Sequence, residues 1–359
     1  MMRGFALVAA LLLAAQSAFA QQAHPSMFAV DSSAAVDETV DLNGNYITGV
    51  TLDAVVSAAF GHGFQGIVRP FLQRLNSGEW NRQVWMATVR YERAGALGLR
   101  IDGGLIPSPI GLANLTLRPQ LNPTIAQPSS LFAPLPPLDP VGIRATLLGA
   151  VYATGTQVTV SGLHWDARSA IIDTSPMRTR RIFAPTNPPR FANVVVGGGV
   201  TPFVGFRVGA SVTHGGWQQA GENPFITADR DATITTVETE LSFDYTKLAA
   251  EWTRDQVETS TADRAASGWY VQGQQTLAPR WFVAGRVEHM AAPAVGGRLN
   301  PSETPLVIDQ SFTGFEETVG FRVTPELTLR AGHRARQGFG RFTYEHAFSV
   351  SAVWWRRWM

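Results

Sequence analysis

The feature that most constrains the fold of this chain is an alternation of apolar and polar residues, clearest at the C-terminus. In the segment 341–359, the residues of one parity are mainly apolar or aromatic: Phe342, Tyr344, His346, Phe348, Val350, Ala352, Trp354 and Trp358. The other parity is mainly polar: Thr343, Glu345, Ala347, Ser349 and Ser351. A period of two predicts a strand with one apolar and one polar face. Aromatic residues at both ends of the apolar face are typical of a strand that crosses a bilayer.

The same alternation recurs as pairs of strands that are joined by very short turns. Six pairs are predicted: 81–93 with 96–107, 141–153 with 156–166, 191–200 with 203–214, 232–243 with 246–258, 268–277 with 281–290, and 312–323 with 327–336. Longer segments separate the pairs: 108–140, 167–190, 215–231 and 291–311. Strands of about ten residues with short turns at one end and long loops at the other indicate an all-β, transmembrane antiparallel β-barrel. The short turns would be periplasmic and the long loops extracellular.

The strand count depends on the N-terminal third of the chain. With a strand over 46–60 and the closing C-terminal strand, the pattern predicts about fourteen strands, an even number as expected for such barrels. The segment 64–79 is either a loop or one more strand. The polar segment 21–45 is interpreted as a periplasmic lead-in, which could be disordered. Sixteen strands are the alternative if both segments contribute one. The barrel domain is therefore expected over 46–359.

The N-terminal twenty residues have the three parts of a secretory signal peptide. Arg3 is followed by an apolar run over 5–15, and Ala18-Phe19-Ala20 forms a small-x-small cleavage site before Gln21. Later apolar stretches are too short for a membrane-spanning helix. We therefore expect a protein that is exported by a cleaved signal peptide to the bacterial outer membrane. The sequence has no cysteine, which excludes disulfides and thiolate metal sites.

A soluble β-sandwich is the main alternative fold, because its strands alternate in the same way. The signal peptide, the asymmetry between turns and loops, and the aromatic strand ends favour the barrel. The aromatic residues expected at the membrane interface are Trp281, Trp354 and Trp358.

If the apolar faces meet lipid, the polar faces line a lumen. The alternation predicts that the following residues line it: Arg90, Arg100, Asp102, Arg144, Arg207, Glu238, Glu240, Glu251, Arg286, Glu288, Glu316, Arg322, Arg330, Arg334 and Arg336. The acids of 238–251 and the arginines of 322–336 would form separate patches, whose field would select solutes by charge and size. The alternative is that these charges only pair with one another.

Two of the long loops have unusual compositions. The segment 108–140 is rich in proline and in apolar residues, so it should fold into the lumen as a constriction, pack on a neighbouring protomer, or form an ordered surface loop. The segment 167–190 is strongly basic: Arg168, Arg178, Arg180, Arg181 and Arg190. These guanidinium groups would attract anions to a pore mouth, bind phosphates of outer-leaflet lipid, or remain solvated.

Nothing in the sequence predicts catalysis, a cofactor or a metal site. Motifs of the HExxH, GxSxG and P-loop types do not occur, and the histidines are scattered singly. The net charge of +1 argues against nucleic-acid binding. We therefore expect a non-enzymatic protein whose partners are outer-membrane lipid and small polar solutes, with a homotrimer as an open alternative.

The passage LRIDGGLIPSPIGL over 99–112, with Gly104, Pro109 and Gly111, resembles the strand-to-loop passage of the phosphate-selective porin superfamily. The terminal strand with its late aromatic residues is similar to the assembly signal of outer-membrane barrels. The chain departs from that family in having one lysine, Lys247, and in ending on Met359 after Trp358.

The resemblance implies a porin-like channel for passive diffusion of small polar solutes, and a weak anion preference is a further expectation. A non-conducting structural or adhesive barrel that binds lipid or a partner through its loops is the alternative, and a barrel enzyme is a third.

Overall fold

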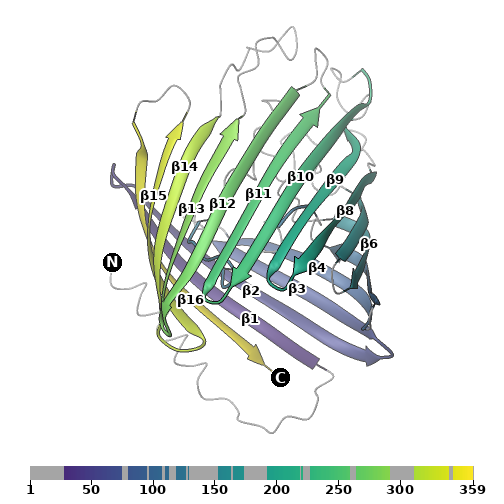
Figure 1. The fold of residues 1–359 in the computed structure, drawn as a ribbon, viewed down its shortest axis with the longest axis horizontal. Coiled ribbons are helices and arrows are strands. Elements are labelled where there is room, and N and C mark those ends of the chain that lie inside the picture. The colour runs from purple at the N-terminus through teal and green to yellow at the C-terminus, as the bar shows by residue number, and fades with distance from the viewer. Residues whose placement is uncertain are drawn as a thin grey trace.

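The structure is a computed structural model of the 359-residue chain. It describes residues 28–74, 80–94, 97–106, 110–112, 119–126, 128, 153–162, 165–173, 192–218, 220, 227–258, 264–291, 311–338 and 343–358. These residues form sixteen strands (Figure 1): β1 (Phe28–Asp41), β2 (Tyr46–Gly61), β3 (Phe64–Arg74), β4 (Trp80–Arg93), β5 (Leu97–Ile106), β6 (Ala153–Gly162), β7 (Trp165–Asp173), β8 (Ala192–Phe203), β9 (Phe206–Gln218), β10 (Arg230–Phe243), β11 (Thr246–Val257), β12 (Arg264–Ala278), β13 (Trp281–Ala291), β14 (Phe312–Arg322), β15 (Leu327–Gly338) and β16 (Glu345–Trp358).

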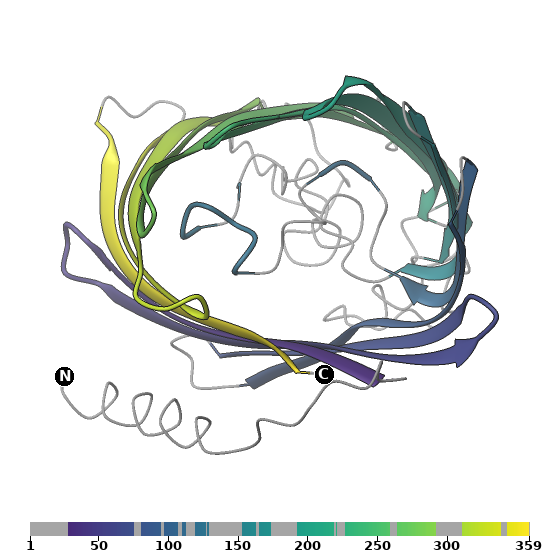
Figure 2. The same ribbon diagram turned by 60° about the horizontal axis from the view of Figure 1, so that its bottom comes forward.

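The sheet is a closed antiparallel barrel. Each strand pairs with its neighbours in sequence, and β1 pairs with both β2 and β16. The closing contact runs from Val30 opposite Trp358 to Asp41 opposite Ala347. Closure leaves no free edge strand, which is the condition for a sheet that crosses lipid. Figure 2 looks into the ring of strands and shows the described parts of the β5–β6 connection inside it.

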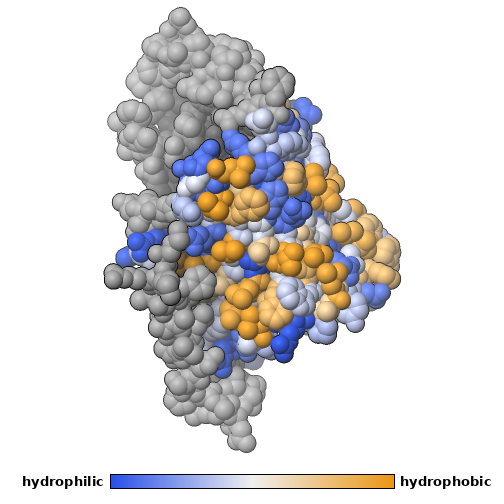
Figure 3. Space-filling view, turned by 90° about the vertical axis from the view of Figure 1, so that its left-hand side faces the viewer, coloured by the Kyte–Doolittle hydropathy of each residue, from blue (hydrophilic) through white to orange (hydrophobic). Residues whose placement is uncertain are grey.

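Burial in the wall is inverted relative to a soluble sheet. On β10, the Glu238 side chain faces the interior and the residue is 1% exposed, while the neighbouring Val237 is 47% exposed on the outer surface. The same inversion separates Arg330 from Leu329 on β15. Figure 3 shows apolar residues gathered on the outer surface on the side of β14 to β16. The predicted alternation is therefore present with its apolar face outward, and closure of the sheet excludes the two-layer sandwich.

The connections at one end of the barrel are all short, and the long connections lie at the other end, although β1–β2 and β3–β4 are joined there by only four and five residues. Two residues join β8 to β9, β10 to β11, and β12 to β13, whereas the connection from β13 to β14 spans 292–311. Asp244, in the turn between β10 and β11, has a φ of 46°, a left-handed conformation that Asp tolerates better than most residues. This asymmetry confirms the pattern of short turns and long loops that the sequence predicts.

The preferred count of fourteen strands is wrong, and the alternative of sixteen is confirmed. The extra strands are β1, which occupies most of the expected lead-in 21–45, and β3, which occupies the ambiguous segment 64–79. The lead-in was hidden because Ser32, Ala34 and Glu38 interrupt the apolar residues on the outward face of β1. The barrel therefore begins at β1 and not at residue 46. The expected signal peptide, 1–20, lies outside the described residues.

Two predicted turns are also corrected. The residues Thr154-Gly155 lie inside β6, where Gly155 pairs with Gly104, and the chain reverses between β6 and β7 instead. The residues Thr201-Pro202 lie inside β8 at a register shift, a position where a sheet tolerates proline. The turn follows at Val204-Gly205. Of the predicted strand 141–153, only Ala153 is described, and it begins β6. The predicted loop 167–190 is wrong at its start, because β7 continues to Asp173. No helix in the described part of the chain has the length and hydrophobicity to span a membrane.

Candidate functional site: a loop clamped inside the barrel

The inner wall carries the charges that the sequence places there. Arg144 lies outside the described residues, and the other predicted lumen residues occupy inward-facing register positions: Arg90, Arg100, Asp102, Arg207, Glu238, Glu240, Glu251, Arg286, Glu288, Glu316, Arg322, Arg330, Arg334 and Arg336. On neighbouring strands these positions lie side by side, which brings acids and arginines from different strands together.

Many of these charges are paired within the wall. Arg207 on β9 donates to Asp166 on β7 at 2.9 Å and to Glu238 on β10 at 2.8 Å. Arg90 and Arg100 both face Asp102, and Arg100 lies 3.2 Å from it. Pairing satisfies charges that would otherwise cost several kcal/mol to bury. For these residues, the alternative that wall charges only pair with one another therefore holds.

A further pair was missed by the sequence analysis. Arg69 on β3 donates two hydrogen bonds to the buried Asp53 on β2, at 2.9 and 3.1 Å. The Arg69 guanidinium also lies 4.6 Å from the centre of the Trp85 ring, which stacks on Phe71. The sequence pattern could have indicated half of this pair, because Asp53 lies on the polar face of its predicted strand. Arg69 lies in the segment 64–79, which was not firmly predicted to be a strand.

Glycines make room for the Arg207 side chain on the wall. A Cβ atom on Gly209 would lie 2.9 Å from Glu238 Oε1, 3.0 Å from Arg207 Nη2 and 2.8 Å from the Gly198 carbonyl. Such distances are too short for ordinary contacts. The glycine is thus required by the ion pair and not by backbone conformation.

Gly209→Ala is expected to destabilise the barrel by about 1–3 kcal/mol, because the added methyl group overpacks the Arg207–Glu238 pair. The matched control is Gly285→Ala on the outer face, where a Cβ would meet only a carbonyl at 3.6 Å. That change should be neutral or stabilise by about 0.4–1 kcal/mol. Urea unfolding from lipid vesicles measures both, and equal effects would contradict the packing argument.

The β5–β6 connection enters the barrel and binds its wall. Ile110 and Leu112 are buried, and the Leu112 N–H donates to Glu251 Oε2 at 2.9 Å. Gly111 has a φ of 64°, and a Cβ there would overlap the Glu251 carboxylate. Only glycine fits this close approach of the loop to the wall. Inward folding is therefore the alternative that holds for the described parts of 108–140.

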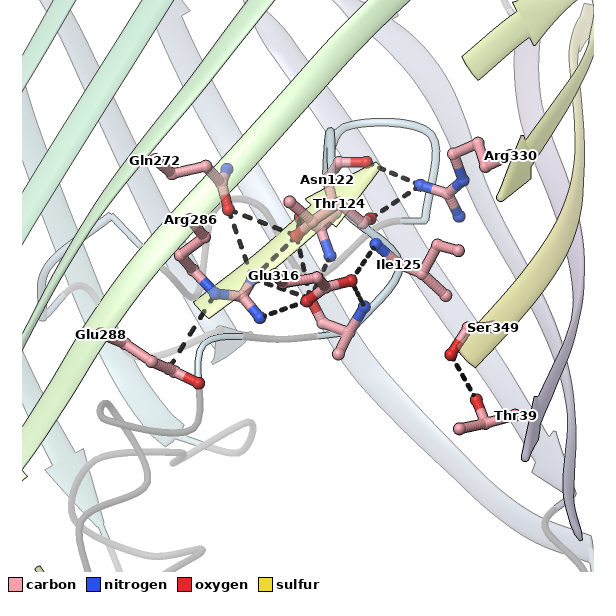
Figure 4. Close-up of polar contacts among 11 residues, drawn as sticks. Thr39, Asn122, Thr124, Ile125, Gln272, Arg286, Glu288, Glu316, Arg330 and Ser349 are labelled. Carbon is pink, nitrogen blue, oxygen red and sulfur yellow. Dashed lines mark hydrogen bonds and ion pairs between the residues drawn. The ribbon is translucent and has the colours of Figure 1, made fainter. Parts of the chain in front are cut away.

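A second part of the same loop, residues 119–126, is held by Glu316 on β14 and Arg286 on β13. Glu316 Oε1 accepts hydrogen bonds from the Ile125 and Ala126 N–H groups, at 2.8 and 3.0 Å. Arg286 donates to Glu316 Oε2 at 2.7 Å, to Thr124 Oγ1 at 2.8 Å and to the Ala126 carbonyl at 2.9 Å. Figure 4 shows this arrangement between the loop and the wall.

Arg330 on β15 completes the attachment. Its Nη1 atom donates to the carbonyls of Asn122 at 2.8 Å, Thr124 at 2.9 Å and Pro119 at 3.3 Å, and its Nη2 atom donates to Ser351. The loop segment has no strand to pair with, so its backbone groups need partners from side chains. We call Arg286, Glu316 and Arg330 the loop clamp.

The loop clamp changes the role of the predicted charges. Glu251 and Glu316 accept loop N–H groups, Arg330 binds loop carbonyls, and Glu238 is paired with Arg207. These residues therefore do not form the free, opposed patches that the sequence suggested. Asn122 and Thr124 were not predicted to bind the wall. The only indication in the sequence is that they are polar residues within an apolar loop.

The remaining predicted site residues are the basic residues of 167–190 and the three tryptophans. Arg168 lies on β7, inside the segment predicted as a loop, in register with Thr159 on β6 and Gly197 on β8. Outside the described part of the chain lie Arg178, Arg180, Arg181 and Arg190. Trp281 packs on Phe321 at 4.6 Å between ring centres. At the end of β16, Trp354 and Trp358 lie 6.3 Å apart.

Aromatic pairs occur at several places on the short-turn end of the barrel. Besides the tryptophans, Phe203 stacks on Phe206 at 5.1 Å, and Phe64 lies 5.0 Å from Tyr91. Trp358 also donates a hydrogen bond from its indole N–H to Ser32, at 2.8 Å. The tyrosine and tryptophan rings among them have one apolar and one polar side, which suits the boundary between lipid and water. Among the described residues, no cluster of three or more His, Asp or Glu side chains could hold a metal ion.

A scan of protein-family models and a search of curated proteins match nothing to this sequence. Solved structures match across most of the chain. OmpF of Salmonella typhi in complex with daunomycin has a TM-score of 0.62 at 10% identity, covering 92% of this chain and 97% of that one. Outer-membrane expressed OmpT of Vibrio cholerae has a TM-score of 0.60 at 9% identity, covering 94% and 100%.

An anion-selective porin from Comamonas acidovorans has a TM-score of 0.56 at 10% identity, covering 92% and 98%. At such low identities the similarity shows the fold alone, which is that of a porin-like outer-membrane β-barrel. It extends to porin-like barrels in general and does not single out the phosphate-selective superfamily.

Proposed function

We propose that the protein is a non-enzymatic channel of the bacterial outer membrane, through which small polar solutes diffuse passively. It reaches the membrane after export by a cleaved signal peptide. The loop segment 119–126 narrows the lumen, and solutes pass between it and the opposite wall. The observation that carries this proposal is the loop clamp, because it holds a loop inside a barrel whose inner wall is polar.

The width of the barrel supports the proposal. Barrels of about sixteen strands leave an aqueous channel, since their side chains do not fill the interior. Ion pairs and hydroxyl groups on the inner wall favour water over lipid inside this space. A constriction in such a barrel selects solutes by size and by the charges that remain unpaired. Weak anion preference belongs to the same proposal and would come from Arg168 and the basic residues that follow it. A homotrimer in contact with outer-membrane lipid is the proposed assembly.

Purified protein in a planar bilayer is expected to give discrete, stable current steps in KCl solution. A KCl gradient across the bilayer should give a reversal potential that corresponds to weak anion selectivity. Absence of steps from a correctly folded barrel would contradict the channel and favour the non-conducting structural barrel. A cation-selective reversal potential would contradict only the anion preference.

A further inference from the structure

A polar recess lies between the tip of the inserted loop and the wall of the barrel. Its volume is about 140 Å³, and its loop side is formed by Ile125 and Ala126. Its wall side comes from strands at the closure of the barrel, and the polar residues that line it are Asp37, Thr39, Thr51, Gln73, Glu316, His333, Arg334 and Ser349. The recess is smaller than typical drug-sized sites, so it suits a solute of few atoms.

Arg334 supplies unused hydrogen-bond donors to this recess. It lies inward on β15, in register with Glu316 and Ala347. Arg334 makes no hydrogen bond, ion pair or ring contact within the described chain. Its neighbour Glu316 is already engaged by Arg286 and by two loop N–H groups. A guanidinium group with free donors is well matched to a carboxylate, which it can bind through two parallel hydrogen bonds.

Asp37 supplies the opposite charge. It lies inward on β1, in register with Ser351, and its Oδ1 atom is buried without a hydrogen-bond partner in the part of the chain that the structure describes. The Arg330 guanidinium nearby donates to Ser351 and to the loop carbonyls. Buried acceptors are almost always hydrogen-bonded, so an unsatisfied carboxylate oxygen on a recess calls for a donor from outside the protein.

Hydroxyl groups line the wall between the two charges. Thr39 Oγ1 and Ser349 Oγ lie 2.8 Å apart. Thr39 is on β1, the strand that carries Asp37, and Ser349 is on β16, which lies between β1 and the strand of Arg334, β15. Hydroxyl groups both donate and accept, so they can bind either end of a polar solute. The recess thus offers an unpaired positive group, an unsatisfied negative group and a neutral polar surface within one small space.

We propose that the recess binds a small zwitterion of the amino-acid type as it passes through the channel. The carboxylate of the solute binds Arg334 and its ammonium group binds Asp37. A simple anion or cation would satisfy one group and leave the other unpaired, which makes the zwitterion the better ligand. This inference rests on the proposed channel function, since it names the class of solute.

The test is current block by 4-aminobutyrate in the reconstituted channel. We expect a saturable decrease in KCl current, while butyrate and butylammonium, which carry one charge each, block at least about tenfold less well. Arg334→Gln and Asp37→Asn should each raise the half-blocking concentration by about tenfold or more. The matched control is Arg322→Gln on β14, an inward arginine that stacks on Phe282 outside the recess, and it should leave the block unchanged.

Equal block by butyrate, or an unchanged half-blocking concentration in both variants, would overturn the proposal. If Arg334→Gln does not fold, Arg334→Lys retains the charge without the planar fork and should still weaken the block. If the folded barrel conducts no current, the proposed channel fails on its own. Titration calorimetry of the detergent-folded barrel with 4-aminobutyrate then decides the recess separately: binding that Asp37→Asn weakens supports the inference, and no binding overturns it.

Discussion

Arg330→Met is expected to release the loop segment 119–126 and raise single-channel conductance by roughly a factor of two, because a wider lumen carries more current. Arg330 is the donor to three loop carbonyls, and methionine of similar length supplies none. A buried carbonyl that loses its partner costs about 1–3 kcal/mol, so three of them are enough to favour a loop that moves toward water. Current recordings in KCl measure the step size, and increased noise between steps is expected as the loop moves.

The control for this variant is Arg322→Met, which also removes an inward arginine at the closure side of the barrel. Arg322 stacks on Phe282 and makes no contact with the described parts of the loop, so its loss should leave the step size unchanged. A normal step size in Arg330→Met would show that Arg286 and Glu316 hold the loop alone. In that case the double variant Arg330→Met/Glu316→Gln becomes the decisive measurement, and normal conductance there would refute the loop clamp.

Val237→Arg is expected to destabilise the barrel by about 2–4 kcal/mol, the cost of placing arginine on a lipid-facing surface near the bilayer midplane. Val237 lies in the middle of β10, is 47% exposed and pairs with Trp252 on β11. In water the same change at an exposed position would be nearly neutral, within about 0.5 kcal/mol. The free energy of unfolding in lipid vesicles, obtained from a urea titration, separates the two environments.

Thr233→Arg is the matched control for Val237→Arg. Thr233 lies on the same strand and the same face but closer to the loop end, where it contacts His214 at 2.9 Å. Near the membrane interface an arginine costs only about 0–1 kcal/mol. If both variants lost the same stability, the outer surface would not have the depth dependence of a membrane protein, and the membrane-embedded barrel would be refuted.

The architecture could be predicted from the sequence because it depends on a local period. Each strand shows its two faces in its own residues, and each short turn follows directly from the strand before it. β13 and β14 were predicted within one or two residues for this reason. β1 was missed because small and polar residues weaken its apolar face, so its strand character depends on pairing with β2 and β16.

The inward position of the charged residues also follows from the sequence, since parity alone places Arg286, Glu316 and Arg330 on the polar face. Their partners do not. The sequence separation between Ile125 and Glu316 is far too large for any local pattern to connect them, and only closure of the barrel brings β13, β14 and β15 to the loop.

By itself, then, the sequence predicted a barrel of alternating strands with a polar inner face, because alternation and turn length are properties of neighbouring residues. Only the tertiary structure decided that the β5–β6 loop folds inward, which arginines bind it, and that Arg334 and Asp37 remain unsatisfied on one recess. The physical reason is that side chains from distant strands meet only when the barrel closes. Which ones meet depends on the register of every strand pair around the ring of sixteen strands.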